Sequence, residues 1–86
     1  MENMIELGSI VKPRYSDMEL MIIGYYPINE ENGITYDYLC VSHVVGMLDS
    51  DSLIAINEEA IEKVVFHGYR NEDADKFIAE LSKFNK

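Results

Sequence analysis

The chain has 86 residues, 48% of them hydrophobic, and 16 acidic residues against 7 basic ones give it a formal net charge of -9. This length and apolar content predict a single globular domain spanning residues 1–86, and they exclude an intrinsically disordered chain. The acidic surplus repels phosphate, so we expect neither nucleic acid nor an anionic membrane surface as a partner. This charge indicates either plain solubility or, alternatively, attraction to a basic protein partner.

Features that set the compartment point to the cytoplasm. No apolar run approaches the ~20 residues of a membrane-spanning helix, since the longest is Leu20 to Ile23. The stretch Met1 to Glu6 lacks the basic start and the apolar core of a secretion signal. Cys40 is the only cysteine, so no disulfide can form within the chain, as is typical of a reducing compartment. We therefore expect a cytoplasmic protein without membrane insertion.

Five strands are expected from apolar, β-branched and aromatic runs that alternate with turn residues. They span about residues 9–15, 19–27, 34–45, 52–56 and 62–69. Pro13 lacks a backbone donor, so it either limits the first strand to an edge or ends it. The unbroken run Leu20 to Ile23 predicts that the second strand is buried on both faces. Alternation fails from Leu39 to Val41, which indicates either a doubly covered region or a bulge.

Short polar residues mark the connections. Asn32-Gly33 is a turn signal because both residues tolerate positive φ. Asp49 to Ser52 predict a turn, since short polar side chains bond nearby backbone groups. Asn57 followed by two glutamates is typical of a single helical turn before the last strand.

A C-terminal helix is expected over about residues 72–84, capped by Asn71 or Asp73. Its apolar residues recur at spacings of three and four and form one stripe, made of Ala74, Phe77, Ile78, Leu81 and Phe84. Burial of this stripe on the sheet contributes about 1.5–3 kcal/mol for each large side chain. We predict an α+β fold: a small five-stranded, mainly antiparallel and strongly bent sheet, or partly open barrel, closed by the C-terminal α-helix.

Residues with metal-binding chemistry are few. Cys40 and His43 form a Cys-x-x-His pair, with His67 as a candidate third ligand. A zinc site needs three or four converging ligands, and residues three apart on a strand point to opposite faces. We therefore expect a buried thiol and a strand imidazole, with no metal and no other cofactor.

Catalytic patterns are also missing from the sequence. The run Asp49-Ser50-Asp51 faintly resembles a calcium loop, but Ile54 and Ala60 stand where such a loop needs a glycine and an acid. No serine lies in a nucleophile motif, and the scattered glycines form no phosphate loop. The sequence predicts that the protein is not an enzyme.

Apolar residues that a strand would leave exposed are the best candidates for function. Adjacent residues of a strand face opposite ways, so one member of a pair such as Tyr25-Tyr26 can be exposed. Exposed aromatic and Met side chains are typical of protein-binding surfaces, whereas a thin core covered from both sides gives the same pattern. The candidate partner-binding residues are Tyr25, Tyr26, His43, Val44, Val45 and Met47.

Several short motifs follow one another along the chain. They are Gly8-Ser9-Ile10-Val11, Leu20-Met21-Ile22-Ile23-Gly24, Tyr36-Asp37-Tyr38, Gly46, and Ile61 with Val64, Phe66, Gly68 and Tyr69. In this order and spacing the chain resembles the small proteins grouped as domain of unknown function 4176, from Gly8 to about Asp75. One departure is His43-Val44-Val45-Gly46, which stands where the family has an aromatic-proline-acid-glycine turn.

The resemblance carries functional expectations and brings no catalytic residues. Members of that family tend to be encoded in type VII secretion loci of Gram-positive bacteria, beside toxins with an N-terminal Leu-x-Gly domain. The leading hypothesis is a non-catalytic cytosolic module that binds a protein from its own gene cluster, as an adaptor or chaperone for such a toxin. The alternative is an immunity protein that neutralises a cognate toxin domain. A small enzyme or metal protein and a homo-oligomer joined through unpaired edge strands are further alternatives.

Overall fold

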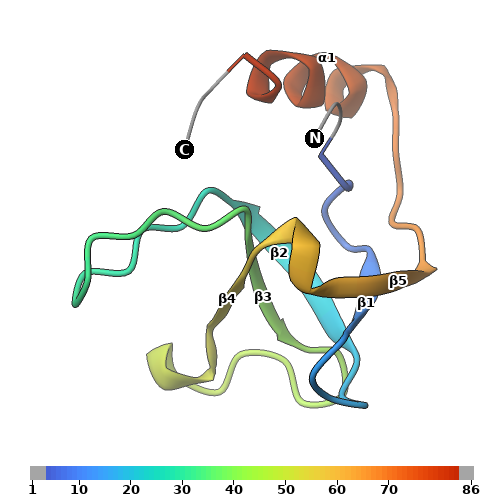
Figure 1. Ribbon diagram of the computed structural model, residues 1–86. Coiled ribbons are helices and arrows are strands. Elements are labelled where there is room, and N and C mark those ends of the chain that lie inside the picture. The colour runs from blue at the N-terminus through green and yellow to red at the C-terminus, as the bar shows by residue number, and fades with distance from the viewer. Residues whose placement is uncertain (1–3, 84–86) are drawn as a thin grey trace.

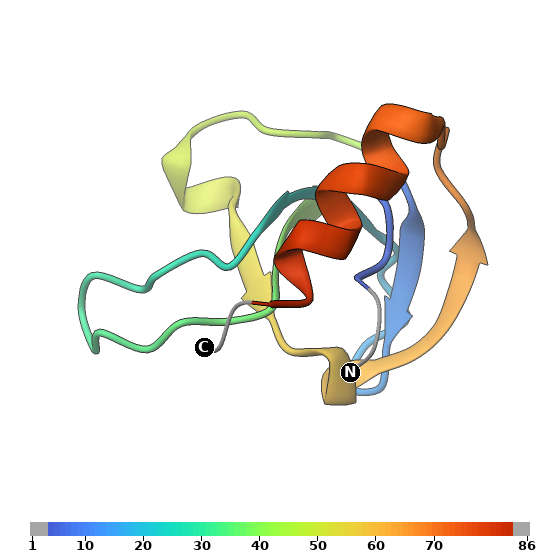
Figure 2. The same cartoon turned by 90° about the horizontal axis from the view of Figure 1, so that it is seen from above.

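The computed structural model describes residues 4–83 (Figure 1). The elements are β1 (Ile10–Pro13), β2 (Leu20–Tyr25), β3 (Tyr38–Ser42), the 3-10 turn η1 (Ser50–Ser52), β4 (Ile54–Ile56), the 3-10 turn η2 (Glu58–Ala60), β5 (Ile61–Phe66) and α1 (Glu72–Leu81). Within these residues five strands form an antiparallel sheet in the order β4-β3-β2-β1-β5. The sheet is curved and open, with β4 and β5 at its edges, and α1 lies over it (Figures 1 and 2). The predicted α+β fold is confirmed.

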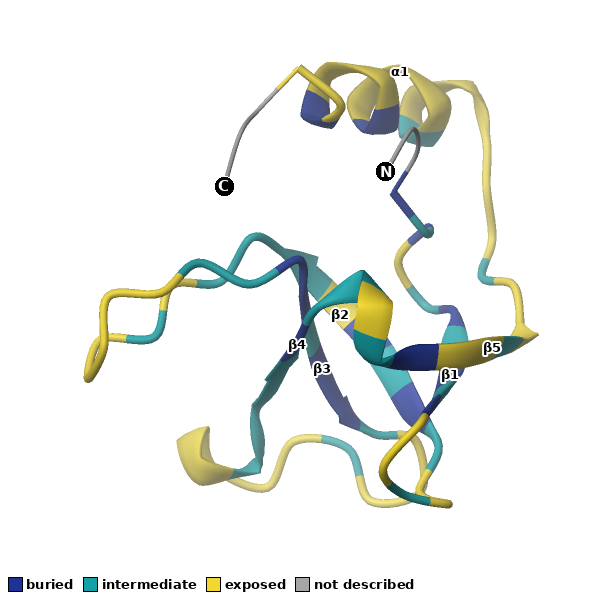
Figure 3. Ribbon diagram, viewed as in Figure 1, coloured by how far each residue is buried: buried dark blue, intermediate teal, exposed yellow. Residues whose placement is uncertain are grey.

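The side of the sheet that faces α1 carries the core. Along β2, Leu20 and Ile22 are fully buried, whereas Met21 is half-buried and Ile23 is 37% exposed. The prediction that this run is buried on both faces is therefore wrong, because α1 covers the sheet from one side only (Figure 3). Both faces are covered instead at the centre of β3, where the neighbouring residues Cys40 and Val41 are both buried. The bulge lies across from them, between Ile22 and Gly24 of β2.

The observed strands are shorter than predicted at most ends. Residues 34–37 precede β3 in a hairpin that the Ile28–Thr35 bridge ties together, and residues 43–45 lie in a turn after it. The fourth strand begins at Ile54 because Ser50–Ser52 coil into η1. Residues 67–69 leave the sheet after β5 to make the connection to α1. Pro13 ends β1, which lies inside the sheet between β2 and β5.

Three layers meet in the core: the sheet, the segment before β1, and α1. The buried cluster consists of Met4, Val11, Leu20, Ile22, Tyr38, Cys40, Ile56, Ile61, Ile78 and Leu81. The segment before β1 rises from the sheet to α1 (Figure 1). Two tyrosines of the sheet hold its backbone. The Ile5 N–H donates to the Tyr38 hydroxyl at 2.9 Å, and the Tyr25 hydroxyl donates to the Ile5 carbonyl at 2.9 Å.

Helix α1 begins at a side-chain cap and packs through part of its predicted stripe. The Asn71 side chain accepts the Ala74 N–H at 2.9 Å, which confirms Asn71 as one of the two predicted caps. Ile78 and Leu81 are buried and Ala74 is half-buried, but Phe77 is 56% exposed. The prediction is therefore wrong for Phe77, whose ring lies beside Tyr25 at the edge of the core. Phe84 and the predicted helix end at 84 lie outside the described residues.

Candidate functional site

The turn after β3 presents apolar side chains to solvent, and we name residues 43–48 the apolar loop. Its backbone is held by Ser42, whose side-chain oxygen accepts the N–H groups of Val44 at 3.2 Å and Val45 at 3.4 Å. The Gly46 N–H donates to the Ser42 carbonyl at 2.8 Å, and Gly46 has the positive φ of 69° that favours glycine. Polar and backbone groups thus build this turn without burying its apolar side chains.

Four of the six residues of the apolar loop are large apolar residues at the surface. Val44, Val45, Met47 and Leu48 are 57–77% exposed. His43 is also exposed, and its Nε2 lies 3.4 Å from Oε1 of Glu19 at the base of the loop. The structure therefore brings four of the candidate residues together, namely His43, Val44, Val45 and Met47. It adds Leu48, which has the same apolar character.

The other two candidates, Tyr25 and Tyr26, lie elsewhere. Tyr25 pairs with Tyr38 at the end of the β2–β3 ladder that is remote from the apolar loop. Both Tyr25 and Tyr26 are half-buried and pack against the core. The Tyr26 hydroxyl lies 3.5 Å from the Leu81 carbonyl at the end of α1. These two tyrosines therefore connect the sheet to the layers above it.

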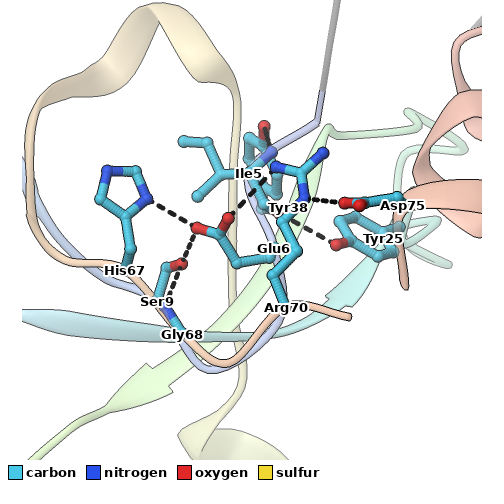
Figure 4. A network of polar contacts seen from close by, with 9 residues as sticks. All are labelled: Ile5, Glu6, Ser9, Tyr25, Tyr38, His67, Gly68, Arg70 and Asp75. Atoms are coloured by element: carbon cyan, nitrogen blue, oxygen red, sulfur yellow. Dashed lines mark hydrogen bonds and ion pairs between the residues drawn. The ribbon is translucent and has the colours of Figure 1, made fainter. Parts of the chain in front are cut away.

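A buried carboxylate forms a second site, which the sequence did not indicate (Figure 4). Glu6 is only 5% exposed. Its Oε1 accepts the Ser9 hydroxyl at 2.6 Å and lies 2.7 Å from Nδ1 of His67, while Oε2 lies 3.3 Å from Nη1 of Arg70. The Ser9 oxygen in turn accepts the Gly68 N–H at 2.9 Å. We name these five residues the Glu6 network.

Hydrogen bonding keeps the Glu6 carboxylate ionised. Burial raises the pKa of Glu6, but the hydrogen bonds from Ser9, His67 and Arg70 outweigh it and hold that pKa below its ordinary value. An ionised carboxylate only accepts hydrogen bonds, so the Nδ1 of His67 carries the proton in this contact. Ser9 is fully buried with its hydroxyl engaged, so it is unsuited to be a nucleophile.

The Glu6 network fastens the segment before β1 to the connection between β5 and α1. The two backbones approach so closely that a Cβ on Gly68 would lie 2.2 Å from the Leu7 carbonyl oxygen. Gly8, with a φ of 85°, packs against Gly68 from the other chain segment. Arg70 extends the connection to α1 through an ion pair of its Nε with Asp75 (Figure 4). The network thus positions the start of α1.

A pocket of about 210 Å³ opens beside the Glu6 network, and we name it the aromatic pocket. It is lined by Glu6, Leu7, Tyr25, Tyr69, Ala74, Phe77 and Ile78. The Tyr25 and Phe77 rings are 6.1 Å apart between centroids, inclined at 43°. Tyr69 is 83% exposed. The lining comes from four separate stretches of chain, so no local sequence pattern could have revealed this pocket.

The residues considered for a metal site lie apart. Cys40 is in the core, where burial raises the pKa of its thiol to about 12. His43 stands at the surface beside Glu19, and His67 contacts Glu6. Within residues 4–83 no three His, Cys, Asp or Glu side chains are grouped as metal ligands.

The turn at Asp49 to Ser52 has a plain structural role. Asp49 caps η1, accepting the Asp51 N–H at 3.0 Å, while Ser52 completes a capping box, so the predicted turn is confirmed.

Every helix within residues 4–83 is too short or too polar to cross a bilayer.

The comparisons with known proteins identify a family. No curated protein and no solved structure matches the chain. The sequence profile of the family "Domain of unknown function (DUF4176)" matches residues 4–77. This span contains the five strands, the apolar loop, the Glu6 network and the first half of α1. The chain therefore belongs to the domain of unknown function 4176 family.

Proposed function

We propose that this protein is a non-catalytic binding module whose apolar loop contacts a protein partner. One observation carries this: Val44, Val45, Met47 and Leu48 are 57–77% exposed within six consecutive residues. Contiguous apolar surface of this kind marks interaction sites, because its removal from water stabilises a complex by roughly 25 cal/mol per Å². Ser42 holds the loop backbone in advance, which lowers the entropy lost on binding.

The partner we propose is a toxin encoded beside this protein and exported by a type VII secretion system. In this role the protein acts in the cytoplasm as an adaptor or chaperone that engages the N-terminal Leu-x-Gly domain before export. The family resemblance supports this assignment, and the net charge of -9 favours a partner with a basic surface.

Co-expression with each neighbouring toxin tests the proposal. The full toxin, its Leu-x-Gly domain and its toxic domain are each tagged and purified, and the retained protein is measured. We expect retention by the Leu-x-Gly domain, with at least about tenfold loss when Val44→Ser and Met47→Ser are combined. The matched control is Ile28→Ser, another exposed apolar residue, which lies in the hairpin before β3 and should leave binding unchanged.

Two results would contradict the adaptor role. Absence of a complex with every neighbouring toxin, or a complex that the loop variant leaves intact, would remove the apolar loop as the contact. Binding to the toxic domain, with protection of cells that express that domain, would identify an immunity protein instead.

A further inference from the structure

We propose that the aromatic pocket is a second binding site, which takes one aromatic or branched aliphatic side chain from a protein segment with lysine or arginine next to it. The pocket lies by α1, and the apolar loop lies at the opposite end of the molecule (Figure 1). The two surfaces share no residue, so this site is independent of the function proposed for the apolar loop.

The size and lining of the pocket favour a single apolar side chain. Its volume of about 210 Å³ is below the roughly 300–1,000 Å³ of pockets that enclose whole small-molecule ligands. Apart from Glu6, the lining residues are aliphatic or aromatic. Three of them, Leu7, Tyr69 and Phe77, are large and exposed, so an apolar occupant would remove part of their surface from water.

The walls of the pocket are held apart by polar contacts. On one side, Arg70 joins Glu6 to Asp75 and so fixes the first turn of α1 (Figure 4). On the other side, the Tyr25 hydroxyl donates to the Ile5 carbonyl and fixes the Tyr25 ring. These contacts hold the first turn of α1 and the Tyr25 ring in place on two sides of the pocket. The site is therefore formed before the occupant arrives, which favours binding.

Acidic residues on α1 favour basic residues next to the side chain that enters the pocket. Asp73 and Glu80 stand four residues before and three residues after Phe77, so they are its neighbours on the surface of α1. Both are exposed, and the exposed pair of Glu80 with Lys83 at 3.3 Å is weak enough to exchange. A second copy of this chain, with a net charge of -9, would be repelled. The surface therefore suits a basic segment of another protein.

Nuclear magnetic resonance of the isotope-labelled full chain tests this site with a peptide probe. The probe is acetyl-Lys-Lys-Phe-Lys-Lys-amide, and two matched peptides replace Phe by Ala or every Lys by Glu. We expect saturable shifts at Leu7, Tyr69, Ala74 and Phe77, with affinity at least about tenfold weaker for either matched peptide. Equal binding of the Ala peptide, or of the Glu peptide, would overturn the proposal.

Two variants of α1 separate the pocket from general surface effects. Ala74→Leu fills the pocket with a good helix former, so the peptide should bind at least about tenfold more weakly. Ala79→Leu adds the same side chain to an exposed position outside the pocket and should leave affinity unchanged. Wild-type affinity in Ala74→Leu, no saturable shift at millimolar peptide, or shifts that depend only on protein concentration would each overturn the proposal.

Discussion

The apolar loop and the Glu6 network distribute side chains in opposite ways. The loop keeps Val44 and Leu48 in solvent, whereas the network keeps the charged Glu6 out of it. Each region is held by hydrogen bonds, through Ser42 in the loop and through Ser9 in the network. Polar contacts therefore fix both connections, but only the network joins layers of the fold. Substitutions in the network should therefore change stability, and substitutions in the loop should change binding.

Deletion of residues 73–86 should destabilise the protein most, because it removes the helix that the Glu6 network positions. Ile78 and Leu81 leave the core, at a cost of about 1.5–3 kcal/mol each, and the core they cover becomes exposed. A domain of this size has little stability beyond that, so we expect an unfolded chain. Far-ultraviolet circular dichroism during heating measures whether the truncated chain is still folded. A cooperative melt of the truncated chain would show that the sheet is stable without α1.

Gly68→Ala should destabilise the fold by about 2–3 kcal/mol, because the added methyl meets the Leu7 carbonyl oxygen at 2.2 Å and the backbones must separate. Gly33→Ala is the control: its φ is 71° but nothing lies within 4 Å of the new methyl, so it should cost about 1 kcal/mol. Urea denaturation compares the two free energies of unfolding. A Gly68→Ala variant as stable as Gly33→Ala would mean that the two segments are not packed together.

Glu6→Gln should destabilise the protein by about 1–2 kcal/mol at neutral pH, because His67 and Arg70 then face a neutral acceptor. The control Glu62→Gln removes an exposed carboxylate 3.5 Å from the Lys12 ammonium and should change stability by less than about 0.5 kcal/mol. Urea denaturation measures both variants. Equal effects would show that burial of the Glu6 charge does not matter.

Lowering the pH should reduce the contribution of Glu6 to stability. The folded pKa of Glu6 lies below its ordinary value of 4.5, so its contribution is complete above that pH and is lost as the pH falls through the folded pKa. The difference in unfolding free energy between wild type and Glu6→Gln should therefore shrink as the pH falls below the ordinary value of 4.5 and through the folded pKa. Acidification also weakens the repulsion among the other carboxylates. This effect is the same in both proteins, so it cancels in the difference. A difference that grows with acid would contradict the lowered pKa.

Val44→Ser gives the smallest effect on stability, less than about 0.5 kcal/mol, because the side chain is already in solvent and the Ser42 contact is to backbone. The same change should weaken partner binding. Glu6→Gln should show the opposite pattern, a loss of stability without a change in the loop that binds. The urea midpoint of the variant measures the first expectation. A loss of more than about 1 kcal/mol would show that the apolar loop is part of the packed fold.

Local patterns predicted the elements of the fold but not all of their limits. The turn at Asp49 to Ser52 and the Asn71 cap depend on neighbouring residues, and both are confirmed. The predicted start of the third strand at residue 34 is too early, because Asp37 has a role that no local pattern shows. Its Oδ2 accepts the Glu58 N–H at 2.7 Å, so it anchors η2 beside the start of β3.

The sequence could predict the candidate site only where a short local stretch of residues determines it. The apolar loop could be recognised from the apolar character of Val44 to Leu48, because its exposure needs no distant contact. The Glu6 network could not, because Glu6, between Ile5 and Leu7, is buried only once β5 lies beside β1. The contact between Tyr25 and Phe77 depends likewise on how α1 packs on the sheet. Together the two residues line a pocket that neither residue predicts alone.

The position of β1 between β2 and β5 has a consequence for how quickly the chain can assemble. The Ser9–Gly68 hydrogen bond joins residues 59 apart in sequence, and the β1–β5 ladder closes over a similar distance. The chain loses entropy when residues this far apart in sequence are brought together, before any stabilising contact forms. Contacts of this kind therefore slow folding. While the ribosome is still making β5, one side of β1 has no neighbour and its backbone groups are open to other chains. A slow step, set by the arrival of β5, therefore follows from the strand order.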